Sequence, residues 1–200
     1  MPLPSQLSID TVELKSNSPT IVSEGRNLVT LARAVPSHRW EATIKSVPLL
    51  SADARAVSAW VNSLGGRFGT FTAILPEVST PKGVATGTPL TSGSYAIGAS
   101  AITMSGFTAS VTGQLKAGDV LKFGNHTKVY QVTADTSSNS SGVAVVNIYP
   151  KLTKAVPSAT AVTVRDVPFL FRLDNDIQEF KLSAQNSGFV RIELDCIEAL

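Results

Sequence analysis

The sequence predicts a mainly β protein: a β-sheet domain with one α-helix, plus an inserted small OB-like β-barrel. Three observations predict this fold class. Short segments rich in β-branched and aromatic residues recur along the 200 residues. A single stretch has clear helical periodicity. The charged residues are distributed unevenly, and the composition, 43% hydrophobic and 16% charged, allows one large domain or two small ones.

The uneven charge predicts an insertion. Between residues 80 and 164 the chain has no arginine and no glutamate, and its net charge is +4, whereas the flanks together have a net charge of −2. The charged residues of the middle are Lys82, Lys116, Asp119, Lys122, Lys128, Asp135, Lys151 and Lys154. Such asymmetry indicates two separately built units. We therefore expect residues 1–79 and 165–200 to form one domain and residues 80–164 an inserted second domain.

The first flank is predicted to contain three strands, one helix and a fourth strand. The strands are expected at Thr11–Leu14, Asn27–Val35, Arg39–Val47 and, after the helix, Phe68–Leu75, with turn signals between the first three. The last of them alternates, with Phe71, Ala73 and Leu75 on one side.

The helix is predicted to begin at Ser51 and to end before Gly65. Ser51 is expected as the N-cap, Asp53 suits the first turn, and Gly65-Gly66 suits a left-handed C-terminal cap. Its apolar stripe, expected to cover a sheet, consists of Ala56, Val57, Trp60, Val61 and Leu64.

The middle segment is predicted to be a barrel of about five short strands. Residues 79–112 have almost no charge but enough apolar anchors to favour strands over a disordered linker. A hairpin follows, formed by Asp119–Phe123, the loop Gly124–Thr127 and Lys128–Thr133. Further strands are expected at Val143–Tyr149 and Ala161–Arg165. Short strands with turn-rich connections are typical of a small barrel such as an OB fold.

After residue 166 the charge pattern of the first flank returns, and three more strands are predicted. They are Phe169–Leu173, Glu179–Ala184 and Phe189–Ile197. In the last one, Val190, Ile192, Leu194 and Cys196 share one side, where a thiol is buried and inert.

Catalytic chemistry is not expected. His126 near Asp119 suggests a His-Asp pair for acid–base work, but a polar turn is favoured because no nucleophile motif accompanies it. His38 is interpreted as a turn residue before a strand. Asp174-Asn175-Asp176 resembles part of a calcium loop but lacks the glycine and the glutamate that complete one, which favours a turn. We predict no catalytic, cofactor-binding or metal-binding residue and no enzyme activity.

Composition excludes several other classes. The single cysteine excludes an internal disulfide and a cysteine-based zinc cluster, and two histidines are too few for most metal sites. The net charge of +2 argues against strong general DNA binding. Without a leader-like N-terminus or a long apolar run, the chain is expected to be made in the cytoplasm and to span no membrane.

Several stretches resemble one family. Lys116–Phe123, His126–Tyr130 and Asn147–Leu152 look like a stretch of distal tail proteins from long-tailed, siphovirus-type bacteriophages, especially those with an inserted OB-fold domain. Ser63–Phe71 and Pro168–Arg172 resemble the ring domain of these proteins.

The resemblance implies a structural virion protein at the tail tip of the phage. It implies a ring, expected to be hexameric, that joins the tail tube protein to the baseplate hub protein and presents the OB-like domain outward. The ring would pass DNA through its lumen, and the outer domain would contact a tail fibre or collar protein.

The alternative is a saccharide-binding or fibre-attachment collar module of the tail tip. Such a module needs exposed aromatic rings to stack on sugars. The middle segment has only Tyr95, Phe107, Phe123, Tyr130 and Tyr149, and at least half of these are expected in its own core. This favours the ring adaptor.

Overall fold

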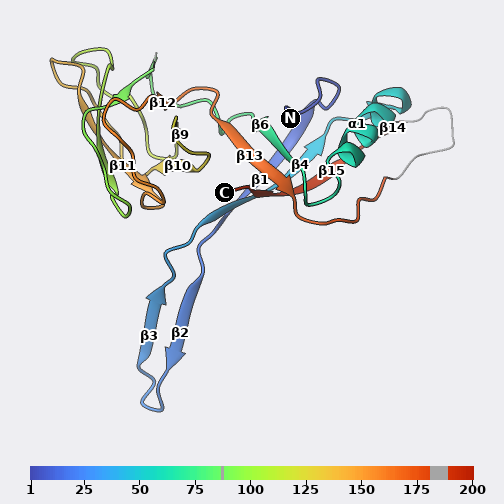
Figure 1. Ribbon diagram of the computed structural model, residues 1–200, viewed down its shortest axis with the longest axis horizontal. Coiled ribbons are helices and arrows are strands. Elements are labelled where there is room, and N and C mark those ends of the chain that lie inside the picture. The colour runs from blue at the N-terminus through green and yellow to red at the C-terminus, as the bar shows by residue number, and fades with distance from the viewer. Residues whose placement is uncertain (87, 181–188) are drawn as a thin grey trace. The chain divides into compact units, whose positions relative to one another are not determined.

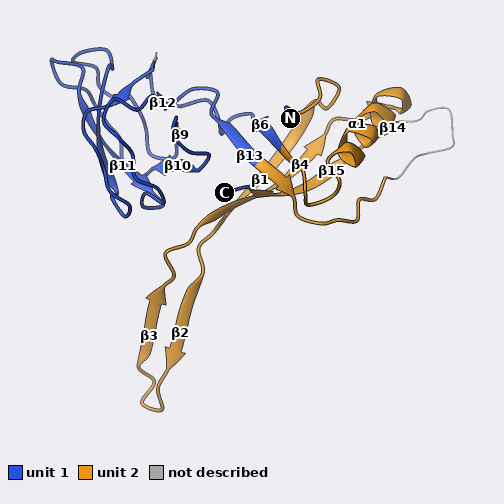
Figure 2. Cartoon of the chain, in the orientation of Figure 1, with its two compact units in different colours: residues 1–2, 71–170, 199–200 blue, residues 3–70, 171–198 orange. Residues whose placement is uncertain are grey.

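The computed structural model describes residues 1–86, 88–180 and 189–200 (Figure 1). The chain divides into two compact units (Figure 2). Unit 1 consists of Met1–Pro2, Phe71–Leu170 and Ala199–Leu200, and unit 2 of Leu3–Thr70 and Phe171–Glu198. The predicted domain boundaries at 79/80 and 164/165 remain a prediction.

Five strands form a sheet in the order β1-β4-β15-β13-β6, and the pairs β1–β4, β4–β15 and β15–β13 are antiparallel. They are β1 (Ile9–Asn17), β4 (Arg39–Ser46), β15 (Glu193–Glu198), β13 (Pro168–Leu173) and β6 (Thr70–Ile74). The predicted alternation is confirmed in β6, where Phe71 and Ala73 are buried, and in the last strand, where Leu194 and Cys196 are buried. Alternation in sequence therefore selects the buried face of this sheet.

The last predicted strand is divided in two. Phe189–Val190 forms β14, which pairs with β5 (Leu49–Leu50), before β15 begins at Glu193. The strand expected at Glu179–Ala184 lies mostly outside the described residues, and its first two positions are not in a strand.

Helix α1 (Ser51–Ser63) is confirmed, but its start and its stripe differ from the prediction. Leu50 is the N-cap and no side chain caps the helix, so Ser51 is the first helical residue. The predicted C-terminal glycines are right, since Gly65 and Gly66 have φ of 64° and 65°. The buried stripe is Ala54, Val57, Val61 and Leu64; Ala56 is exposed and Trp60 is only partly buried. The prediction placed the stripe too far round the helix.

A hairpin that the sequence only half predicts extends from the ends of β1 and β4 (Figure 1). It consists of β2 (Thr20–Glu24) and β3 (Thr30–Ala34). Asn27–Val35 was expected as one strand, but Asn27 to Val29 belong to the turn, where Leu28 has φ of 61°. The strand β2 was missed. It buries no side chain, so it has no alternating pattern to detect.

The rest of unit 1 is built on a six-stranded, nearly closed barrel-like sheet in the order β12-β9-β10-β11-β8-β7. The strands are β7 (Leu90–Thr91), β8 (Ala101–Ser105), β9 (Val120–Phe123), β10 (Val129–Val132), β11 (Ala144–Tyr149) and β12 (Val162–Thr163). An antiparallel bridge between Leu90 and Ala161 links the two edges of this sheet. The predicted hairpin is confirmed as β9 and β10.

The barrel has its own hydrophobic core. Phe123, Tyr130 and Leu121 are fully buried at its centre, and Met104 and Val146 pack from β8 and β11. The fold class is therefore confirmed as mainly β with a barrel-like sheet and, among the described residues, one helix.

Candidate functional site

The described residues hold no cluster of three or more histidine, cysteine, aspartate or glutamate side chains that suits a metal ion. In the same part of the chain, no helix is long and apolar enough to cross a membrane. Two residues of the Asp174-Asn175-Asp176 turn instead organise the loop after β13. Asp176 Oδ1 accepts a hydrogen bond from the backbone N–H of Arg67 at 2.9 Å, and Asn175 Oδ1 accepts one from Ile177 at 3.1 Å.

The structure does not bring His126 and Asp119 together as an acid–base pair. The Asp119 side chain, 3% exposed, accepts hydrogen bonds from the backbone N–H groups of Lys82, Gly83 and Lys116 at 2.8, 3.1 and 2.8 Å. Its task is to hold the segment entering the barrel against the β9 strand. Asp119, in the stretch Ala117-Gly118-Asp119, thus has a structural anchoring role.

His126 is more than a polar turn residue. Its Nδ1 lies 2.8 Å from Asn125 Oδ1, and its Nε2 lies 2.7 Å from the Tyr130 hydroxyl. Since Asn125 Nδ2 donates to the carbonyl of Ala155, the network assigns the His126 proton to Nδ1 and makes Nε2 an acceptor for Tyr130. Burial, with the positive charges of Lys154 and Lys122, lowers the pKa of His126 from 6.5 to about 4. The ring is therefore neutral at pH 7.

The other two singled-out residues are buried. His38, expected in a turn, is 4% exposed, hydrogen-bonds with Ser16 Oγ at 2.9 Å and packs edge-on against Trp40. Cys196 is buried as predicted, and burial raises the pKa of its thiol far above the usual range. A thiol in this state is inert.

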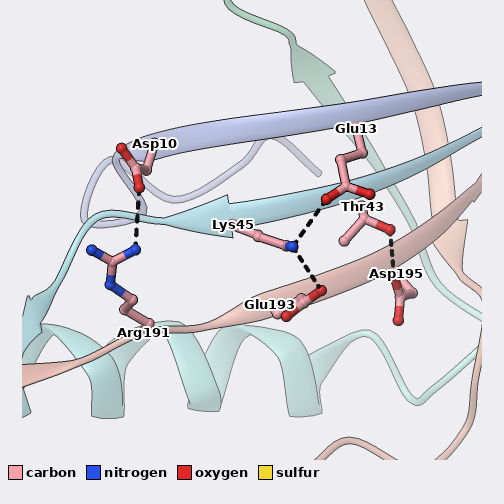
Figure 3. A network of polar contacts seen from close by, with 7 residues as sticks. All are labelled: Asp10, Glu13, Thr43, Lys45, Arg191, Glu193 and Asp195. Atoms are coloured by element: carbon pink, nitrogen blue, oxygen red, sulfur yellow. Dashed lines mark hydrogen bonds and ion pairs between the residues drawn. The ribbon is translucent and has the colours of Figure 1, made fainter.

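The outer face of the sheet in unit 2 carries a network of charged side chains (Figure 3). Lys45 lies on β4, between β1 and β15. Its Nζ is 3.0 Å from Oε1 of Glu13 on β1 and 3.6 Å from Oε1 of Glu193 on β15. The hydrogen bond between Lys45 and Glu13 lowers the pKa of the Glu13 carboxyl and raises the pKa of the Lys45 ammonium group. Arg191 pairs with Asp10 at 3.3 Å.

Two hollows adjoin this face and share the carboxylate of Asp195, which accepts a hydrogen bond from Thr43 Oγ1 at 2.6 Å. The larger, of about 350 Å³, we call the acidic hollow, because three carboxylates and one guanidinium are among the described residues that line it. Its residues are Asn175, Ile177, Gln178, Glu179, Arg191, Glu193 and Asp195. The smaller hollow, of about 250 Å³, lies over β1 and β4.

The hairpin β2–β3, which we call the arm, is the second surface feature of unit 2. Every residue from Thr20 to Ala34 is exposed. Large apolar side chains are among them: Ile21 is 60% exposed, Leu31 72% and Leu28 79%. A sheet of two strands alone is marginally stable in water, so an apolar ribbon of this kind is suited to contact with a partner.

Sequence reasoning identified neither the arm nor the acidic hollow. The hollow joins residues from the loop after β13 and from β15, and the charged face adds residues from β1 and β4. The charge of the flanks indicated only the inserted domain.

Residues 77–164 match the family described as distal tail protein pb9, B domain. The matched segment contains the whole barrel, from β7 to β12. No curated protein sequence matches the chain. The match agrees with the resemblance noted at Lys116–Phe123 and indicates a structural role in the phage tail. Through residues 77–164 the chain is similar to the bacteriophage distal tail protein family.

Proposed function

We propose that the chain forms a closed ring, with six copies, at the distal end of the tail, where it joins the tail tube protein to the baseplate hub protein. The observation that carries this proposal is the match of residues 77–164 to a distal tail protein domain. A structural task also fits the chemistry of the chain, in which the two best candidates for a reactive pair, His126 and Asp119, have separate structural partners.

The surfaces of unit 2 support assembly by contact between identical copies. The arm and the acidic hollow are different surfaces on one chain, so a contact between them would be heterologous. Heterologous contacts form a ring where the rotation closes and a filament where it does not. A tail needs the closed form.

The barrel is proposed as an OB-like domain on the outer side of the ring, where it contacts a fibre or collar protein. The lumen is then lined by the acidic flanks, with a net charge of −2, so that DNA passes without being held by phosphate contacts. An inner wall formed by Lys116 and Lys122 would contradict this. The buried Lys128, 2% exposed, belongs to no wall.

The saccharide-binding alternative has little support in the barrel. Of its five aromatic residues, Phe107, Phe123 and Tyr130 are buried in the core and Tyr95 packs against it, as expected. Tyr149, 41% exposed, is the one large aromatic platform that remains. Binding of the intact chain to host-surface saccharides would favour this alternative.

The decisive experiment is a cryo-electron microscopy reconstruction of the virion tail. The proposal expects this chain at the tail tip, in six copies, between the tube and the hub. A position on the tube wall, or a copy number that is incompatible with a closed ring, would overturn it.

A further inference from the structure

The arm is an unpartnered ribbon with two different faces. In an antiparallel pair, residues directly opposite each other point to the same face. The pairs Ile21–Arg33 and Ser23–Leu31 therefore share one face of the arm. The other face carries the pairs Thr20–Ala34, Val22–Ala32 and Glu24–Thr30, so the one carboxylate of the arm lies on that face. The first face thus combines two large apolar groups with one guanidinium.

The acidic hollow has the complementary chemistry. Three of its side chains are carboxylates, of Glu179, Glu193 and Asp195, and Ile177 at its edge is 80% exposed. Among the described residues that line it, the one cation is Arg191, which is paired with Asp10. The arm has two arginines and one glutamate, so its net charge is +1. An apolar group beside negative charge in the hollow matches an apolar group beside positive charge on the arm.

We propose that the arm of one copy docks into the acidic hollow of a neighbouring copy, with Arg33 facing the carboxylates and Ile21 and Leu31 packing against Ile177. This inference rests on the proposed ring and names the surfaces that close it. Burial of the arm's apolar face stabilises a ribbon that is marginal alone, and charge complementarity sets its register.

The test uses charge reversal at both surfaces. Arg33→Glu and Glu193→Arg each place like charges together at the contact, so each alone is expected to weaken association at least tenfold. The double variant restores opposite charges and is expected to recover most of it. Both residues are exposed, and Glu193 contributes only a surface ion pair to Lys45, so the fold is retained. Arg55→Glu, on the exposed side of α1, is the matched control and is expected to associate like the parent.

A second variant removes the arm without disturbing the sheet. The backbone N–H of Val35 donates to the carbonyl of Pro19 at 3.1 Å, so Thr20–Ala34 can be replaced by Asn-Gly, which closes a two-residue turn at that bond. Association is measured by native mass spectrometry of the isolated chain and by the copy number of the chain in reconstructed tails. If the isolated parent is monomeric, the copy number in the tails is the deciding measurement.

The outcomes separate this inference from the proposed function. Loss of the ring on arm removal, with recovery in the double charge-reversal variant, supports both. A complete ring without the arm overturns the arm contact and leaves the ring in place. Loss in Arg33→Glu with no recovery in the double variant overturns the hollow as the receptor. Parent tails without a ring of this chain overturn the proposed function itself.

Discussion

Asp119→Asn should destabilise the barrel, because Asp119 is a buried carboxylate that accepts three backbone hydrogen bonds. Oδ1 accepts from Lys82, and Oδ2 accepts from both Gly83 and Lys116. An asparagine keeps at most two of these bonds, by placing its oxygen where Oδ2 lies. Its NH₂ group then faces the third N–H, donor against donor. A hydrogen bond to a charged group contributes about 1.5–3 kcal/mol, and the orphaned amide adds a desolvation cost, so the expected loss is roughly 2–4 kcal/mol.

The assay is urea-induced unfolding followed by tyrosine fluorescence, which reports on the barrel because all three tyrosines lie in residues 80–164. The matched control is Asp135→Asn. The exposed side chain of Asp135 accepts a single hydrogen bond, from Ala117 at 2.9 Å, and its loss should cost under about 1 kcal/mol. Equal unfolding free energies for the two variants would refute the anchoring role of Asp119.

Three further predictions concern stability. Because the folded pKa of His126, about 4, lies below its ordinary 6.5, the unfolded state binds the proton first, and stability should fall as the pH drops from 6.5 through 4. The partly exposed ring limits this loss of unfolding free energy to about 1–2 kcal/mol. In urea unfolding, the free energy of unfolding of His126→Gln should fall less than that of the parent over the same pH range. Trp60→Ala should cost about 2 kcal/mol in thermal unfolding, less than for a fully buried indole, because Trp60 is partly exposed; an unchanged Tm would contradict this packing. Replacing Pro81–Thr163 by a short Gly/Ser linker should leave a protein whose five-stranded sheet and helix α1 still unfold in a cooperative thermal transition. If no such transition is seen, the barrel is needed for the sheet to fold.

The sequence predicted the elements that bury a face. In β6 and in Glu193–Cys196 of β15 buried and less buried residues alternate, and in α1 the buried residues recur at helical spacing. Alternation and helical spacing are the patterns that burial imposes on a sequence, so these elements were found. The predicted cap at Ser51 was wrong for a different reason: Ser51 has cap chemistry, but the N-cap position falls one residue earlier, at Leu50.

The candidate surfaces could not be predicted in the same way. The arm buries nothing, so its first strand leaves no pattern, and the acidic hollow forms only when β15 pairs with β4 and places Glu193 beside Lys45. The role of His126 was also missed, because its partner Tyr130 faces it only once the β9–β10 hairpin has formed. Contacts of this kind depend on pairing register, which local sequence patterns do not specify.

The exposed arm also has a consequence for the chain before it is assembled. Both of its strands have an open edge, and open edges with apolar side chains are templates for indiscriminate strand addition and aggregation. Glu24, Arg26 and Arg33 interrupt the apolar residues of the arm and act as gatekeepers against that process. The same few side chains would then both limit aggregation of the free subunit and form the proposed contact with the neighbouring copy.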